Sequence, residues 1–113
     1  MSLATWLAAA ARLRGDAPAL LTGERLDADY ATFACRAAGL GAAFAARFGV
    51  GPGDRVGLFL KNRTEYLEIL FGAWWAGAAV VPINAKLHPK EAAWILEHAG
   101  ARLVVADDPA LAP

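Results

Sequence analysis

Apolar positions in the second half of the chain alternate between short runs of strand length and longer stretches with helical spacing. The short runs are residues 55–60, 79–83 and 102–106, and the helical stretches are residues 64–76 and 89–99. Gly77 and Gly100 follow the two helical stretches and are expected to end them. This alternation predicts an α/β fold with a βαβαβ unit, in which Leu58, Val80 and Val104 lie in neighbouring parallel strands.

The first half of the chain predicts a helix, a small hairpin and a longer helix. The helix spans residues 3–14, the hairpin pairs residues 19–22 with residues 25–26, and the longer helix spans residues 30–48. The expected apolar faces are Leu3, Trp6, Leu7 and Ala10 on the first helix, and Phe33, Ala37, Leu40, Phe44 and Phe48 on the longer one. Asp29 is expected to cap the longer helix, since its carboxylate can accept from free amides of the first turn. Gly39 and Gly41 inside it are expected to allow a neighbouring element to approach closely.

The two later helices also have recognisable starts. Asn62 and Glu65 have the spacing of a capping box before the first of them. Pro89 occupies the first position of the second, where its missing N–H is harmless. The first of these helices is apolar over a wide arc, so we expect Leu70, Phe71 and Trp74 to lie largely inside.

Composition and charge exclude several classes of function. The 113 residues make one domain or a piece of one, 58% hydrophobic, with 11 basic and 11 acidic residues. No basic stripe is present, so we expect no nucleic acid partner. The longest uncharged run, residues 69–85, is divided by Gly77 and Pro82, which argues against a membrane span. The start lacks the positive region of a signal peptide, so cytoplasm is the expected location.

Familiar catalytic and cofactor motifs are missing from the sequence. The glycines at residues 49–53 precede a strand instead of following one, so they read as a turn and not as a dinucleotide fingerprint. Gly72 and Gly77 have the outer spacing of a phosphate-binding loop, but alanines replace its Lys and Ser or Thr. Ser2, the only serine, does not lie in a nucleophile elbow. We therefore assign no catalytic, cofactor-binding or metal-binding residue.

Several polar side chains outside these motifs could in principle carry chemistry. His88 and His98 are ten residues apart without a second ligand group, so a zinc site is not expected. Glu65 and Glu68 could share a helix face, but we expect solvated charges. Cys35 is expected to be a packed thiol in a helix interior. Lys61, Asn62 and Arg63 follow a predicted strand end, where ligands or a partner domain approach such sheets, although simple helix capping also explains them.

Four segments, in order along almost the whole chain, resemble the adenylate-forming (AMP-binding) ligases. They are Tyr30-Ala31-Thr32-Phe33 at a helix start, Gly53-Asp54-Arg55-Val56 followed by Asn62 and Glu65, the run from Trp75 to Asn84, and Pro89-Lys90-Glu91 continuing to Ile95-Leu96 and Gly100-Ala101. Asp29, Thr32 and Trp75 depart from the family pattern, at positions to which no catalytic role attaches. Asn84 resembles the acyl-CoA ligase branch, whereas peptide-synthetase adenylation domains more often carry Asp there.

The resemblance implies that residues 1–113 are the N-terminal, incomplete part of an AMP-binding ligase domain. Such enzymes activate a carboxylate with ATP to an acyl adenylate and then transfer the acyl group to CoA, here from a fatty or related organic acid. The resemblance places the phosphate loop, the substrate pocket and the mobile lysine downstream of Pro113. We therefore expect a scaffold that is inactive alone, with no cofactor of its own, while ATP, Mg and CoA serve the full-length enzyme.

Two other interpretations stay open. The chain could be a non-catalytic interaction module that keeps only the ligase scaffold, or a small α/β binding domain unrelated to ligases. The partner that we expect is the remainder of a ligase chain, or a second copy held through exposed apolar surface.

Overall fold

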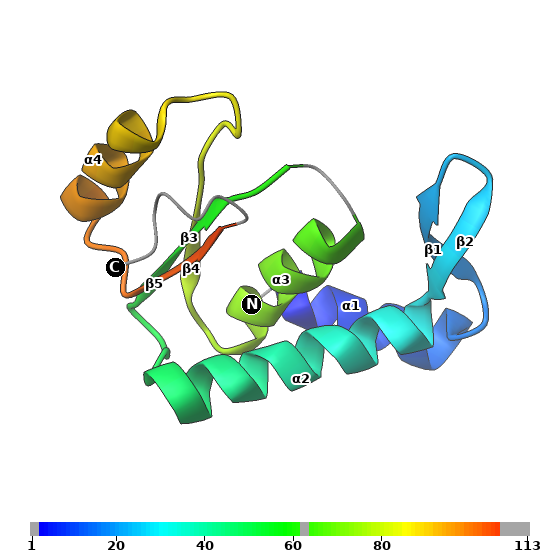
Figure 1. Ribbon diagram of the computed structural model, residues 1–113. Helices are drawn as coiled ribbons and strands as arrows, with labels where there is room; N and C mark the ends of the chain where they lie inside the picture. Colours follow the sequence, from blue (N-terminus) through cyan, green and yellow to red (C-terminus); the bar gives the residue numbers. More distant parts are fainter. Residues whose placement is uncertain (1–2, 62–63, 107–113) are drawn as a thin grey trace.

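The structure, a computed structural model, describes residues 3–61 and 64–106. These residues fold as four helices and five strands in two sheets (Figure 1). The elements are α1 (Leu3–Arg14), β1 (Pro18–Thr22), β2 (Arg25–Asp29), α2 (Tyr30–Phe48), β3 (Arg55–Phe59), α3 (Thr64–Trp75), β4 (Ala79–Pro82), α4 (Pro89–Ala99) and β5 (Leu103–Ala106). The predicted order of elements is confirmed. The predicted bounds differ by at most one residue except at β2, which runs three residues further, to Asp29. The capping role expected of Asn62 lies outside the described residues.

The three strands of the second sheet are neighbours and parallel, as the sequence predicted, and the structure gives their order as β4-β3-β5. Leu58 of β3 lies opposite Pro82 of β4 on one side and Val105 of β5 on the other. Alternate residues of β3 face opposite layers: Val56 and Leu58 pack with α2 and α3, whereas Phe59 packs with α4. Helices therefore cover both faces of the sheet (Figure 1).

The helix α2 connects this sheet to the rest of the chain. Asp29 caps it as predicted: its Oδ1 accepts a 2.8 Å hydrogen bond from the Thr32 amide, which lowers the pKa of Asp29. Gly49 ends the helix in the left-handed conformation. The hairpin β1–β2 is antiparallel and packs with α1 against the start of α2.

Close helix contact occurs where α2 crosses α3. A Cβ added to Gly41 would lie 2.8 Å from the Gly72 carbonyl oxygen, so the two backbones touch at this point. The prediction of close approach is thus confirmed for Gly41 and wrong for Gly39, where an added Cβ would meet nothing within 4 Å.

The buried face of α1 agrees with the predicted one at Leu7, which is fully buried, but it turns toward Ala4 and away from Leu3 and Trp6. Leu3 and Trp6 are each 55% exposed, while Ala4 and Leu7 are buried. The helix thus turns a smaller side chain toward its neighbours, which allows close packing, and leaves Trp6 at the rim. The Trp6 ring still contacts those of Tyr30 and Phe71, with centroids 6.2 and 6.3 Å apart.

Leu70, Phe71 and Trp74 are partly buried, in agreement with the expectation that they lie largely inside, although none of them is fully buried. Two further expectations about burial need correction. Phe48, at the last turn of α2, is half exposed. Cys35 is exposed, since each residue turns about 100° around a helix and the buried face of α2 is set by Phe33 and its neighbours.

No helix within residues 3–61 and 64–106 combines the length and the apolar character that crossing a membrane requires.

Candidate functional site

The connections out of β3 and β4 leave a crevice at one edge of the sheet. The helix α3 follows β3 and packs on one face, while α4 follows β4 and packs on the other. Because β3 and β4 are neighbours in the sheet, their carboxyl ends part toward opposite faces. Ligands of open α/β sheets bind at such topological switch points. The topology therefore predicts a binding site just beyond Phe59 and Pro82.

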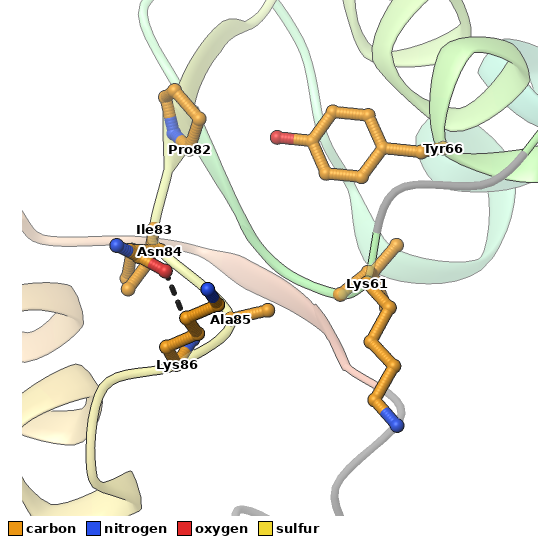
Figure 2. Close-up of a pocket in the computed structure, with 8 residues that line it drawn as sticks. Lys61, Tyr66, Pro82, Ile83, Asn84, Ala85 and Lys86 are labelled. Carbon is orange, nitrogen blue, oxygen red and sulfur yellow. Dashed lines mark hydrogen bonds between the residues drawn. The ribbon is translucent and has the colours of Figure 1, made fainter.

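A cavity of about 570 Å³ lies at this point, and we call it the switch-point pocket (Figure 2). It is lined by Leu60, Lys61, Tyr66, Pro82, Ile83, Asn84, Ala85 and Lys86. Its volume falls within the roughly 300–1,000 Å³ typical of small-molecule sites. The Tyr66 ring reaches from α3 toward Pro82, so the wall of the pocket spans the crevice between the two layers (Figure 2).

The segment after β4 is folded by short-range hydrogen bonds. Ile83 donates its amide to the Leu58 carbonyl at 2.9 Å, which extends the parallel pairing by one residue. The chain then turns at Asn84, whose Oδ1 accepts from the Lys86 amide at 2.9 Å. His88 caps α4 by accepting from the Lys90 amide at its Nδ1. The sheet thus holds the backbone at Ile83, and hydrogen bonds within residues 84–90 hold the turn that follows.

The charges around the switch-point pocket are positive. Lys61 comes from the end of β3 and Lys86 from the turn after β4, and no acidic residue is among the described residues that line the cavity. The remaining lining includes a phenol, an amide and several apolar side chains. Such a cavity is suited to a small ligand with an apolar body and an anionic group.

The structure brings together only part of what the sequence singled out. Lys61 does lie on the pocket, whereas Asn62 and Arg63 fall outside the described residues. Tyr66 and Lys86 were missed, although their signal was the same: a position beside the carboxyl end of a predicted parallel strand. Periodicity does not distinguish Tyr66, in the first turn of α3, or Lys86, in a loop, from ordinary surface residues.

The two histidines lie away from the pocket lining and play local roles. His88 caps a helix, and His98 stacks on Trp94 with ring centroids 4.9 Å apart. In the described part of the chain no three His, Cys, Asp or Glu side chains gather where they could hold a metal ion.

Glu68 is not the solvated charge that the sequence predicted. It is buried, and its Oε1 accepts a 3.1 Å bond from Arg36 Nη1. The pair joins α3 to α2, while Glu65 is exposed as expected.

Comparisons with known proteins agree on one family. A family model described as AMP-binding enzyme matches residues 7–113. The 4-hydroxybutyrate–CoA ligase 2 of Metallosphaera sedula is 43% identical over 65 residues, which are 58% of this chain and 12% of that protein. The 2-succinylbenzoate–CoA ligase of Geobacillus kaustophilus is 37% identical over 109 residues, 95% of this chain and 21% of that protein. The chain thus spans only a small part of the length of these relatives.

Solved structures also match the fold of this chain. The inhibitor-bound N-terminal domain of FACL13 from Mycobacterium tuberculosis matches with a TM-score of 0.84 and 27% identity. The match covers 93% of this chain and 26% of that chain.

Proposed function

Because this chain belongs to the AMP-binding enzyme family, we propose that residues 1–113 form the N-terminal part of the ligase domain of an ATP-dependent acyl-CoA synthetase. The observation that carries the proposal is the family match over residues 7–113, together with relatives that are CoA ligases. The complete enzyme would activate a carboxylate to an acyl adenylate with release of pyrophosphate, and then pass the acyl group to the CoA thiol.

The acid that we propose is a fatty or related organic acid. The two relatives named above act on 4-hydroxybutyrate and on 2-succinylbenzoate, so they support an organic acid without selecting a chain length. ATP, Mg and CoA would be required by the full-length protein, which we place in the cytoplasm.

We further propose that the 113-residue chain is inactive alone. A triphosphate needs convergent backbone amides or a basic clamp, usually with a metal ion. Among the described glycines, Gly49 ends a helix, Gly53 lies in a turn and Gly41 lies where two helices cross. The described lining of the switch-point pocket includes cationic side chains but no glycine-rich loop with convergent amides, so the pocket would contribute to a site that other segments complete.

Calorimetric titration with Mg-ATP and a pyrophosphate-release assay with a panel of organic acids test this proposal. We expect neither saturable micromolar ATP binding nor acid-dependent pyrophosphate release from the 113-residue chain. The same assay on the full-length protein should show acid- and CoA-dependent turnover. Turnover by the short chain would overturn its inactivity, and a full-length protein inert toward every acid would overturn the synthetase assignment.

A second candidate function, an interaction module, is favoured by an exposed apolar patch across α1 and α3. Leu3 and Trp6 are 55% exposed and Leu67 is 40% exposed, on helix turns adjoining the contact between the Trp6 and Phe71 rings. Such surface promotes association. Sedimentation of the 113-residue chain should show concentration-dependent self-association that Trp6→Gln weakens. A strictly monomeric chain would count against this reading.

A further inference from the structure

The turn after β4 presents Lys86 to the switch-point pocket, and one side chain forms that turn. The side-chain oxygen of Asn84 accepts a hydrogen bond from the Lys86 amide (Figure 2). The backbone carbonyl of Asn84 accepts a second one, of 3.0 Å, from the Leu87 amide. An asparagine that bonds the backbone two residues ahead imitates a backbone turn and fixes the path of the chain. Two hydrogen bonds to one residue therefore set where the Lys86 backbone lies.

Lys86 is well suited to meet a ligand. It is exposed, it lines the cavity, and its ammonium group forms no ion pair with another described residue. Among the described residues, no carboxylate neutralises this charge. Asn84 also lines the cavity, but its side-chain oxygen accepts from the Lys86 amide, so the effect of losing that oxygen on a bound anion is transmitted through Lys86.

We propose that Asn84 is a positioning residue, which holds Lys86 at the switch-point pocket so that the ammonium group binds the anionic group of a ligand. The inference rests on the proposed function, because an acyl-CoA synthetase takes both a carboxylate and phosphate-bearing substrates. The shared chemistry is a small anion beside apolar walls. Which of the two anions is preferred is a matter for separate titrations.

Amide NMR titrations of the 113-residue chain with inorganic phosphate and, separately, with butyrate test the binding. We expect saturable shifts of the amides from residue 83 to residue 87 with at least one of the two anions. Lys86→Met should abolish saturation. Lys90→Met is the matched control, since Lys90 loses the same charge nearby but does not line the pocket, and it should bind as the wild type does. Equal binding by both variants, or no saturation in the wild type, would overturn the proposal.

Substitutions at Asn84 test the positioning role. Asn84→Ala removes the acceptor and should weaken the anion roughly fivefold, the equivalent of one ordinary hydrogen bond. Asn84→Ser keeps a hydroxyl that can make the same local turn and should recover part of the affinity. Circular dichroism shows whether each variant is folded, and the serine variant keeps the test informative if the alanine variant is not. Wild-type affinity in Asn84→Ala, or no recovery in a folded Asn84→Ser, would refute the role.

The outcome is separable from that of the proposed function. If anion binding depends on Lys86 and Asn84 but the full-length protein activates no acid, the pocket proposal stands and the synthetase proposal fails. If the full-length enzyme turns over but the pocket shows no response to anions, the synthetase proposal stands and the pocket proposal fails.

Discussion

Replacing Gly41 by alanine tests the packing of α2 on α3. The added Cβ would lie 2.8 Å from the Gly72 carbonyl oxygen and 2.9 Å from the Trp75 Cβ. Both contacts are shorter than normal van der Waals separation, and the first involves backbone that cannot rotate away. Overpacking of this kind typically costs about 1–3 kcal/mol, because two helices must move apart to relieve it.

Gly39→Ala supplies a matched control two residues earlier in the same helix. Its added Cβ meets nothing within 4 Å, and Gly39 is exposed. Both substitutions gain the roughly 1 kcal/mol by which alanine is favoured over glycine in a helix interior. The gain cancels in the comparison, so the difference between the two variants measures the steric cost alone. We expect Gly39→Ala to stabilise the chain, and Gly41→Ala to be less stable than Gly39→Ala by about 1–3 kcal/mol.

Urea unfolding followed by far-UV circular dichroism measures both free energies of unfolding, provided that the slopes with urea agree. Gly72→Ala approaches the same contact from α3, since its Cβ would lie 2.8 Å from the Leu40 Cβ. It should also be destabilised relative to Gly39→Ala. If Gly41→Ala proves as stable as Gly39→Ala, the two helices are not in backbone contact and the packing described above is wrong.

Three further predictions concern single side chains. The hydrogen bonds from Thr32 lower the pKa of Asp29 in the folded chain. The wild type should therefore be more stable than Asp29→Ala by a constant amount above an ordinary aspartate pKa of about 3.9, and this difference should vanish as the pH falls through the lowered pKa of the folded state. Thermal melts of both proteins across pH measure the difference. Arg36→Met leaves the buried Glu68 without its partner and should lower the free energy of unfolding in urea by about 1–3 kcal/mol. Glu68→Gln should lower it less, because the half-exposed Arg36 can be hydrated. Equal losses in the two variants would mean that Glu68 is itself hydrated. Cys35 is exposed and should react fully with a thiol reagent in the native chain at neutral pH, whereas protection until unfolding would contradict its placement.

The sequence was most informative where periodicity and end signals act together. The stretch from β3 to β5 was predicted with its order and its parallel pairing, because apolar runs, helix-length spacing and terminal glycines all agree. Asp29 and Pro89 marked helix starts for reasons confined to one turn of chain. Local chemistry of this kind does not depend on which distant element packs nearby.

Errors arose where a face had to be chosen between competing apolar residues. On α1 the buried position belongs to Ala4 and not to the larger Trp6, because close packing against other helices favours the smaller side chain. Glu68 was expected in water, yet it finds Arg36 thirty-two positions away, a partner that no spacing rule reveals. The pocket could not be predicted from local sequence either. Lys61, Tyr66 and Lys86 line one cavity only because two crossovers leave the sheet on opposite faces.

The central position of β3 in the sheet affects how the chain folds during translation. The ribosome makes β3 before either of its neighbours, and β5, which completes its second edge, ends roughly 47 residues after Phe59. At about 5–20 residues per second, translation leaves that edge without its partner for roughly 2–9 s. Small domains typically fold in microseconds to seconds once their chain is complete. The nascent chain thus carries an open apolar strand for a period that is long on the scale of folding, and we expect its yield in cells to depend on translation speed and on chaperones that cover strand edges.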